Sequence, residues 1–163
     1  PNCLDFLIAN VTVPVFLDTV SAKKTAIAND KIKNIRCIKP NEYEAEILSG
    51  VKVSDEQSAL DACQKIAQRG IDTIYLSCGE DGSYCYQNGK FIHVPFFKTN
   101  VVNTTGAGDS FMAGVVYGFM KGMSVEKSAE FAAACSSVTV SSIDTVCKDI
   151  SAQKVFDIIN KNA

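Results

Sequence analysis

Short apolar segments rich in β-branched and aromatic residues alternate with helical patterns along this chain. Strand-like segments run over 13–18, 35–38 and 73–77, and helical patterns over 19–30, 41–50 and 54–69, of which 19–30 is the weakest. This alternation is typical of parallel sheets, because a strand reaches its parallel neighbour through a crossover, usually a helix. The pattern predicts an α/β fold with a mostly parallel, doubly wound sheet flanked by helices.

The second half of the sequence predicts one hairpin followed by three helices. Asn88-Gly89 lies between strand-like 83–87 and 91–94, which is a strong signal for a two-residue turn joining antiparallel strands. The helices are predicted over 109–121, 124–141 and 151–161. Earlier in the chain, Ser54 and Gln57 have the spacing of a capping box for the helix over 54–69. No repeat or low-complexity linker divides the chain.

Charge and cysteine content limit the classes of function. The 163 residues carry a net charge of −2 with no basic stripe, so nothing indicates nucleic acid or an anionic membrane surface as a partner. The apolar stretches are too short to span a bilayer. Seven cysteines without CxxC spacing are typical of small buried hydrophobes in a reducing compartment, which predicts a cytoplasmic protein. His93, the single histidine, is predicted to be a half-exposed strand residue without a catalytic role.

Residues 101–111 carry the strongest functional signal, since an apolar run leads into a Thr/Gly turn and then a helix. In Thr104-Thr105-Gly106-Ala107-Gly108-Asp109 two glycines flank an alanine, so backbone N–H groups can approach an anion. The helix that starts there adds unpaired N–H groups and a favourable dipole. Asp109 beside such a site suits a base that takes a proton from a hydroxyl attacking a phosphate. The alternative is a plain strand-to-helix turn.

Two other strand ends carry residues that suit a ligand site, because open α/β sheets bind ligands at the carboxyl ends of their strands. Asn41 and Glu44 lie three residues apart on one helix face, so both can point to one site. Taken alone, the pair also fits a helix cap with a solvated glutamate. Lys39 precedes them and could belong to the same site. The alternative interpretation is a surface lysine at a strand end. The glycine turn over 77–82 also fits a simple β-turn.

Together these three motifs resemble the PfkB, or ribokinase-like, family of sugar and nucleoside kinases. Residues 103–111 match the family highly specifically, Asn41 and Glu44 match its second motif, and 77–82 is similar to its nucleotide-loop strand end. The motifs occur in the family order over nearly the whole chain. The resemblance implies a ribokinase-like α/β fold and transfer of the γ-phosphoryl group of ATP, with Mg²⁺, to a hydroxymethyl group of a sugar or nucleoside.

The resemblance also implies a role for each matching residue. The catalytic set would be Asp109 as the base, with the backbone N–H groups of Gly106, Ala107 and Gly108 as the anion hole. The nucleotide site would be lined by Lys39, Asn41, Ser77, Gly79, Gly82 and Thr105. Glu44 would help to hold Mg²⁺ through waters, supported by Asn41, because Mg²⁺ keeps much of its hydration shell.

Asn103 departs from the pattern of many members, in which an Asp at this place belongs to a monovalent-cation site. Asparagine keeps a carbonyl ligand but loses a full charge, so K⁺ as a further cofactor stays open. Asn103 together with 139–146 is most similar to the pseudouridine kinase branch. The resemblance therefore favours pseudouridine as the acceptor, with ribose or fructose as alternatives.

Family members are considerably longer than this chain. Residues 1–163 are therefore expected to form the C-terminal part of a single kinase domain that lacks its N-terminal half and lid, with little activity alone. The expected partner is a small sugar or nucleoside, and a homo-oligomer is compatible with the sequence. A non-catalytic nucleotide-binding module is the second hypothesis. A nicotinamide-binding domain is disfavoured, because no GxGxxG follows the first strand.

Overall fold

The structure is a computed structural model that describes residues 2–33 and 35–162, and it divides into two units. The first unit comprises 1–78 and 84–92, and the second comprises 79–83 and 93–163. The elements of the first unit are α1 (Asn2–Asn10), β1 (Phe16–Asp18), α2 (Ala22–Ala28), η1 (Asn29–Lys31), β2 (Cys37–Lys39), α3 (Glu42–Ser49), α4 (Glu56–Ala67), β3 (Thr73–Ser77) and most of the hairpin β4 (Ser83–Gln87) and β5 (Lys90–Val94). The second unit holds η2 (Gly79–Asp81), α5 (Ala107–Met120), α6 (Val125–Val140) and α7 (Ala152–Asn162).

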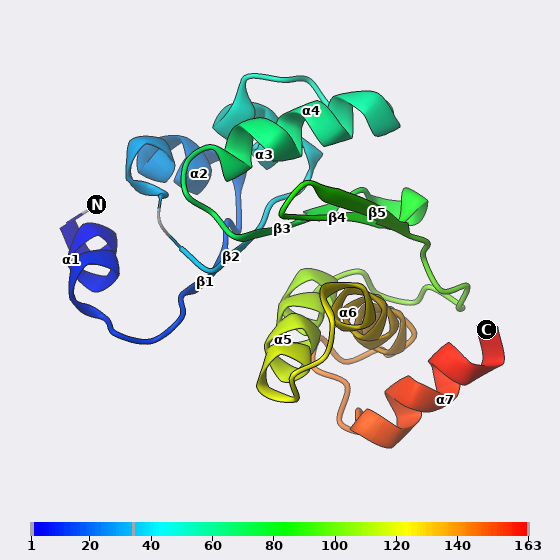
Figure 1. Cartoon of the computed structure of the whole chain (residues 1–163). Coiled ribbons are helices and arrows are strands. Elements are labelled where there is room, and N and C mark those ends of the chain that lie inside the picture. The colour runs from blue at the N-terminus through cyan, green and yellow to red at the C-terminus, as the bar shows by residue number, and fades with distance from the viewer. Residues whose placement is uncertain (1, 34, 163) are drawn as a thin grey trace. The chain divides into compact units, whose positions relative to one another are not determined.

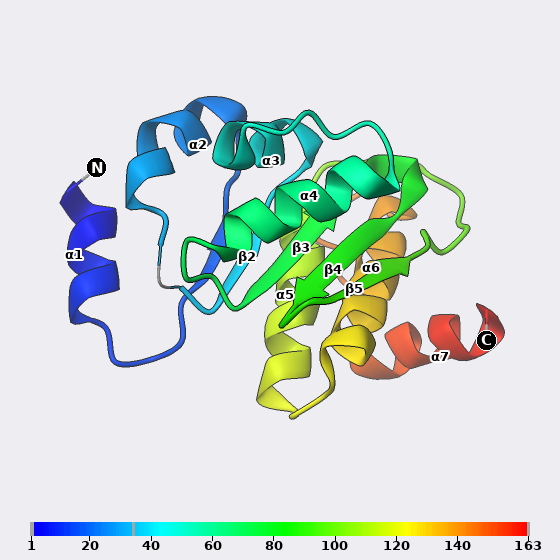
Figure 2. The same ribbon diagram turned by 45° about the horizontal axis from the view of Figure 1, so that its top comes forward.

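Five strands form one sheet in the order β1-β2-β3-β4-β5 (Figure 2). β1 pairs parallel to β2 with Asp18 opposite Lys39, and β2 pairs parallel to β3 with Ile38 opposite Ile74. The links from β3 to β4 and from β4 to β5 are too short for a crossover, so these neighbours are antiparallel. Asn88 and Gly89 both have positive φ, 50° and 81°, as a tight hairpin turn requires. The predicted mostly parallel α/β sheet with one hairpin is confirmed.

The core of the first unit lies between this sheet and its helices. α2, α3 and α4 lie on one side of the sheet (Figure 1). α4 turns its residues at helical spacing inward, and its Ala59, Cys63 and Ile66 are fully buried with Ile38 and Ile74 of the sheet. Burial of each large aliphatic side chain contributes about 1.5–3 kcal/mol. This packing fixes the strand ends that carry Lys39 and Asn41.

Several predicted element boundaries are wrong by a few residues. The cap of α4 is Asp55 and not Ser54, because the Asp55 carboxylate accepts the Ser58 N–H at 2.8 Å while Ser58 Oγ accepts the Asp55 N–H at 3.0 Å. Two start positions also differ, since β1 begins at Phe16 rather than at 13 and α5 begins at Ala107 rather than at 109. Proline at 14 cannot donate to a strand ladder, which agrees with the later start of β1.

In the second unit α5 and α6 run side by side, with α7 against α6 (Figure 1). Glycines permit this close approach, since a Cβ at Gly114 would lie 2.6 Å from Ala132 Cα and one at Gly118 would lie 2.5 Å from Ser128 Oγ. Phe131 of α6 adds aromatic packing. Its ring stacks on the ring of Tyr117 on α5 and lies 5.1 Å from the ring of Phe156 on α7. The three predicted helices are confirmed.

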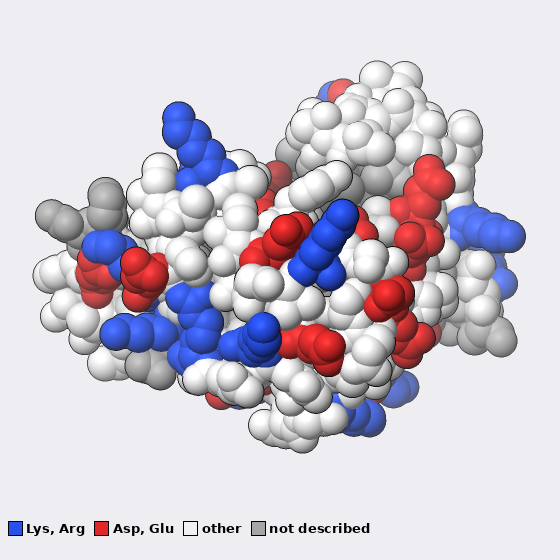
Figure 3. Space-filling view, turned by 90° about the horizontal axis from the view of Figure 1, so that it is seen from above, with Lys and Arg blue, Asp and Glu red and all other residues white. Residues whose placement is uncertain are grey.

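The seven cysteines are all free, and six of them are buried while Cys3 is exposed. This confirms the prediction of small buried hydrophobes. His93 is exposed, and its Nε2 lies 2.7 Å from the Asp81 carbonyl oxygen. Among the described residues, no helix has the length and apolar character needed to cross a membrane. Basic and acidic side chains both occur across the face seen in Figure 3.

Candidate active site

Asn41 and Glu44 form a reciprocal cap at the start of α3. Asn41 Oδ1 accepts the Glu44 N–H at 2.9 Å, and Glu44 Oε2 accepts the Asn41 N–H at 2.9 Å. The predicted helix cap is therefore confirmed. The alternative of a solvated glutamate is wrong, because only 3% of Glu44 is exposed. A buried carboxylate needs partners, since burial without them would penalise its charge.

Lys39 also lies inside the first unit rather than on its surface. Only 6% of Lys39 is exposed, and its Nζ lies 3.2 Å from Asp18 Oδ2. The surface-lysine alternative is therefore wrong. The ion pair follows from the register of the sheet, because Asp18 and Lys39 are direct neighbours at the ends of β1 and β2.

Ser77 joins this group from the end of β3. Its N–H and Oγ both donate to the Pro40 carbonyl oxygen, at 3.0 and 3.3 Å. Ser77 also forms an isolated parallel β-bridge with Asn41. The structure thus brings Lys39, Asn41, Glu44 and Ser77 together at the carboxyl ends of β2 and β3. That edge is where open α/β sheets bind ligands.

Two residues of this cluster, Asp18 and Thr19, are not part of any of the three sequence motifs. Asp18 pairs with Lys39, and the Thr19 hydroxyl lies 2.5 Å from Glu44 Oε2. Asp18 is the last residue of a predicted strand, and the end of a parallel strand is the signal that could have found it. Thr19 begins a predicted weak helix, and no spacing rule connects it to Glu44, which is 25 residues away.

Gly79 and Gly82 belong to the second unit and form a tight turn around η2. The Gly82 N–H donates to the Gly79 carbonyl at 3.2 Å, and φ is 55° at Gly79 and 88° at Gly82. A Cβ at Gly82 would lie 2.3 Å from the Val94 carbonyl oxygen, so backbone packing alone already requires glycine there. A Cβ at Gly79 would meet nothing within 4 Å, so the backbone is open on that side.

Gly106 is the N-cap of α5, and no side chain caps this helix. Its φ is 85°, and a Cβ there would lie 2.3 Å from the Thr145 carbonyl oxygen. Both the backbone conformation and the steric overlap therefore require glycine. The Ala107 N–H donates to the Thr104 carbonyl at 3.3 Å. The N–H groups of Gly106, Gly108 and Asp109 have no acceptor in the described part of the chain. Unpaired N–H groups at a helix N-terminus attract anions.

Asp109 lies in the first turn of α5 with its side chain exposed. Within residues 2–33 and 35–162 its carboxylate makes no hydrogen bond or ion pair, in contrast to Asp55, which caps its own helix. The carboxylate is therefore free to accept a proton from a ligand. Two hydrogen bonds from α6 hold this end of α5, Ser136 Oγ to the Ala107 carbonyl at 2.7 Å and Thr139 Oγ1 with Ser110 Oγ at 2.6 Å.

Asn103 connects the turn to the segment after α6. Its Oδ1 accepts the Thr105 N–H at 2.9 Å, and its Nδ2 donates to the Ile143 carbonyl at 3.3 Å. The Thr105 N–H is therefore engaged by a side chain, unlike the N–H groups that follow it. In the described part of the chain no group of three or more His, Cys, Asp or Glu side chains could hold a metal ion by itself.

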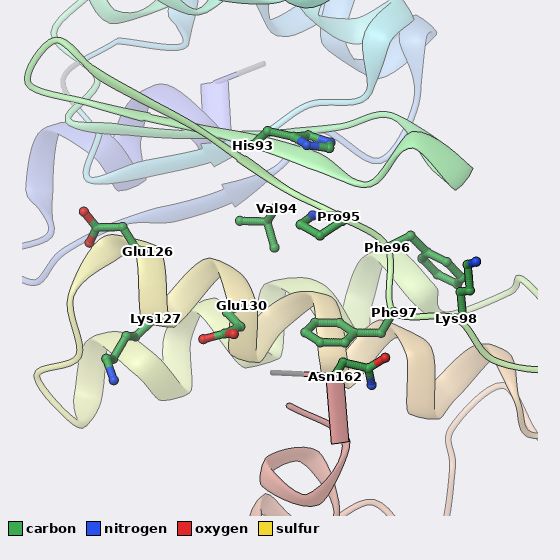
Figure 4. A pocket seen from close by; sticks show the side chains of 10 residues that line it. All are labelled: His93, Val94, Pro95, Phe96, Phe97, Lys98, Glu126, Lys127, Glu130 and Asn162. Carbon is green, nitrogen blue, oxygen red and sulfur yellow. The ribbon is translucent and has the colours of Figure 1, made fainter. Parts of the chain in front are cut away.

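A separate cavity of about 490 Å³ lies in the second unit (Figure 4). Residues 93–98, the first turns of α6 with Glu126 and Glu130, and Asn162 line it. None of the predicted site residues is among them. Phe97, one of the lining residues, accepts a hydrogen bond through its carbonyl oxygen from Ser137 Oγ at 3.1 Å, and Ser137 follows Ser136 on α6.

Comparison with known proteins identifies the family. The model of the pfkB family carbohydrate kinases matches residues 5–150. Pseudouridine kinase from Escherichia coli strain K12 is 38% identical over 148 residues, which are 90% of this chain and 47% of that protein. A crystal structure from Clostridium perfringens, provisionally described as a sugar kinase, is 32% identical with a TM-score of 0.95 over 99% of this chain and 52% of its own.

A ribokinase from Arabidopsis thaliana, solved with ribose and ATP, is 25% identical with a TM-score of 0.81 over 96% of this chain and 52% of its own. The chain thus spans about half the length of the relatives it matches. A family model that covers nearly the whole chain agrees with the motifs at Asn41, Glu44 and 103–109. This chain belongs to the PfkB family of carbohydrate kinases.

Proposed function

We propose that this chain carries the ATP-binding and phosphoryl-transfer part of a sugar or nucleoside kinase. The γ-phosphoryl group of ATP would pass to a hydroxymethyl oxygen of the acceptor, and Asp109 would take the proton from that hydroxyl. One observation carries the proposal. The N-terminus of α5 presents unpaired N–H groups and, in the same turn, a carboxylate without a partner among the described residues.

These groups suit phosphoryl transfer, which depends on positioning and charge stabilisation more than on covalent chemistry. The N–H groups of Gly106 and Gly108 would stabilise the charge on the transferring group, as an anion hole does. The Ala107 N–H would join them if it left its long 3.3 Å bond to the Thr104 carbonyl. Asp109 would accept the proton directly, because no other group of the described chain competes for its oxygens.

The cluster in the first unit fits a hydrated Mg²⁺. It contains four carboxylate oxygens, of which Asp18 Oδ1 accepts the Val20 N–H, Asp18 Oδ2 pairs with Lys39, and Glu44 Oε2 accepts the Asn41 N–H. Glu44 Oε1 alone has no partner among the described residues. A single carboxylate oxygen is enough for a magnesium ion that keeps several waters. When bound, the ion would neutralise phosphate charge.

The nucleotide contacts are proposed from the family resemblance of the residues that carry the motifs. Lys39 and Ser77 would lie beside the phosphates together with Asn41, and Gly79, Gly82 and Thr105 would leave room for the nucleotide against the backbone. The similar ribokinase was solved with ATP, which supports this cofactor. For K⁺, Asn103 offers only an amide whose Nδ2 already binds the Ile143 carbonyl. Exchange of K⁺ for Na⁺ in a phosphorylation assay tests whether K⁺ is a cofactor.

Pseudouridine is the proposed acceptor, because the relative with 38% identity is a pseudouridine kinase. Ribose is the main alternative, since a ribokinase shares the fold at 25% identity. The chain spans about half the length of these relatives. From the family resemblance of its motifs, we assign residues 1–163 to the C-terminal part of one kinase domain. The N-terminal half of such a domain would supply most acceptor contacts and the lid.

The test is Asp109→Asn in a polypeptide of the relatives' length that contains this chain. We expect the kcat for pseudouridine phosphorylation to fall by about 10²–10⁴, because the variant loses the proton acceptor. The Kd of ATP measured by calorimetry should stay within about threefold, since the N–H groups remain in place.

Retained turnover in the variant would reject Asp109 as the base. Binding of ATP without transfer to pseudouridine, ribose or fructose by the wild type would instead favour a non-catalytic nucleotide-binding module. Conversion of the substrate at equal rates in K⁺ and Na⁺ would reject K⁺ as a specific cofactor.

A further inference from the structure

Thr19 lies between the ends of two strands and the start of α3. Thr19 is 5% exposed, and its hydroxyl oxygen is 2.5 Å from Glu44 Oε2 and 3.1 Å from the Lys39 carbonyl oxygen. A hydroxyl has one proton to donate, and the charged, closer carboxylate is the stronger acceptor. Thr19 therefore donates to Glu44.

This hydrogen bond makes the two oxygens of Glu44 unequal. Oε2 accepts from both Thr19 Oγ1 and the Asn41 N–H, while Oε1 has no partner in the described part of the chain. Two donors on one oxygen fix the rotation of the carboxylate group. Without the Thr19 hydroxyl, only the Asn41 N–H would hold it, and the group could turn about its last side-chain torsion, which is broad.

The backbone beside Thr19 is strained. Val20 has a φ of 65°, a region that β-branched residues rarely occupy. The Ser21 N–H closes a three-residue turn on the Thr19 carbonyl at 2.7 Å, and Asp18 Oδ1 accepts the Val20 N–H at 3.2 Å. Val20 is 64% exposed, so burial does not compensate the strain. Strained residues of this kind occur where a structure holds neighbouring groups for a function.

We propose that Thr19 is a positioning residue for magnesium binding, whose hydroxyl holds Glu44 so that Oε1 is the oxygen presented to the hydrated ion of the nucleotide. This inference rests on the proposed function. Hydrogen-bond partners of metal-binding carboxylates affect metal affinity by about 10- to 100-fold, because they orient the ligand oxygen. Thr19 would do this from outside the Asn41–Glu44 motif.

A purely structural role for Thr19 gives a different expectation. The hydroxyl would then only tie the end of β1 to the start of α3, and its loss would lower the melting temperature without a specific effect on the metal. Alanine and serine at position 19 separate these roles, because both lack the threonine methyl group and they differ only in the hydroxyl. Thr25 is the matched control, since it is 1% exposed and its hydroxyl donates to the Ser21 carbonyl at 2.8 Å.

The experiment measures binding of Mn²⁺, as a substitute for Mg²⁺, to the 163-residue chain with a non-hydrolysable ATP analogue, by electron paramagnetic resonance. We expect Thr19→Ala to weaken Mn²⁺ binding about 10-fold and Thr19→Ser to stay within about twofold of the wild type. The analogue's affinity without metal should not change. Thr25→Ala should lower the melting temperature by circular dichroism and leave Mn²⁺ binding unchanged.

Equal Mn²⁺ affinities for Thr19→Ala and Thr19→Ser would overturn the inference while the proposed function stands. If the wild-type chain binds the analogue with no dependence on Mn²⁺, Glu44 holds no metal. That result would overturn both this inference and the magnesium site of the proposed function. A comparable loss in Thr25→Ala would also overturn the inference, since the effect would come from the fold and not from Glu44.

Discussion

At the scale of single residues, Gly106 has two separate reasons to be glycine. Its φ is 85°, and a Cβ would lie 2.3 Å from the Thr145 carbonyl oxygen. Gly122 has only the first reason, with φ of 66° and nothing within 4 Å of a Cβ. The two positions lie at opposite ends of α5, so they allow the backbone strain and the steric overlap to be measured separately.

We expect Gly122→Ala to lower the free energy of unfolding by about 1–2 kcal/mol, the typical penalty of a left-handed alanine. Gly106→Ala should lower it by about 2–5 kcal/mol, because displacement of the Thr145 backbone adds to that penalty. Gly106→Ala should also weaken ATP binding, since the N-terminus of α5 would shift. Urea unfolding and calorimetry measure both quantities, and equal destabilisation by the two variants would contradict the steric argument.

The sequence indicates a residue's local role better than its distant contacts. The Asn41–Glu44 cap and the glycine at 106 follow from spacing within a few residues, and the structure shows a cap and a left-handed glycine there. Lys39 and Glu44 are paired in their buried positions by Asp18, the last residue of β1, and by Thr19, the residue after it. Only the strand register brings these side chains together, and motif spacing does not contain it.

At the scale of secondary-structure elements, the packing of α5 on α6 opposes helix propensity. Alanine favours helices over glycine by about 1 kcal/mol, so Gly114→Ala would stabilise an isolated α5. In the protein, however, the new Cβ would lie 2.6 Å from Ala132 Cα. We expect a net loss of about 1–3 kcal/mol, because the two helices must separate.

Ala113→Gly is the control, since Ala113 is exposed on the same helix. It should lose about 1 kcal/mol through propensity alone. Chemical unfolding monitored by circular dichroism compares the two variants. Higher stability of Gly114→Ala than of the wild type would show that α5 and α6 can adjust without loss.

Element boundaries show where spacing rules stop being sufficient. The capping-box rule favours Ser54–Gln57, because glutamine is a usual residue at the third helical position, although Asp55–Ser58 has the same spacing. The structure selects Asp55, whose carboxylate accepts the Ser58 N–H and whose pKa is lowered by that hydrogen bond. Because the pKa of Asp55 is lower in the folded state, its contribution to stability is present above the ordinary aspartate pKa and is lost as the pH falls.

At the scale of the whole molecule, buried thiols report on the integrity of both units. Burial raises the pKa of Cys37, Cys63 and Cys135 to about 12, so these thiols stay protonated in the folded chain at neutral pH. Cys3 is the exposed cysteine among the seven. Only the thiolate reacts with disulfide reagents, so exposure and pKa together decide which cysteine is modified.

We expect a disulfide reagent at pH 8 to modify one thiol rapidly in the native chain and all seven in denaturant. Cys3→Ser should abolish the rapid phase and serves as the control. The raised pKa values imply stability that is fully present below the ordinary thiol pKa and is lost as the pH rises towards 12. More than one rapid thiol in the native chain would contradict the burial of the other six.

The length of the chain relative to its family bears on its catalytic activity. The chain spans 47% of the pseudouridine kinase it resembles, yet it contains the α5 turn and the Asn41–Glu44 cluster. If acceptor contacts lie in the other half of such a domain, the 163-residue chain should bind ATP but transfer its phosphoryl group at least about 100-fold more slowly than a polypeptide of the relatives' length. A coupled assay for ADP release, with calorimetry for ATP, separates the two functions. Turnover of pseudouridine or ribose by the 163-residue chain at the rate of the longer polypeptide would show that the acceptor site lies within these residues.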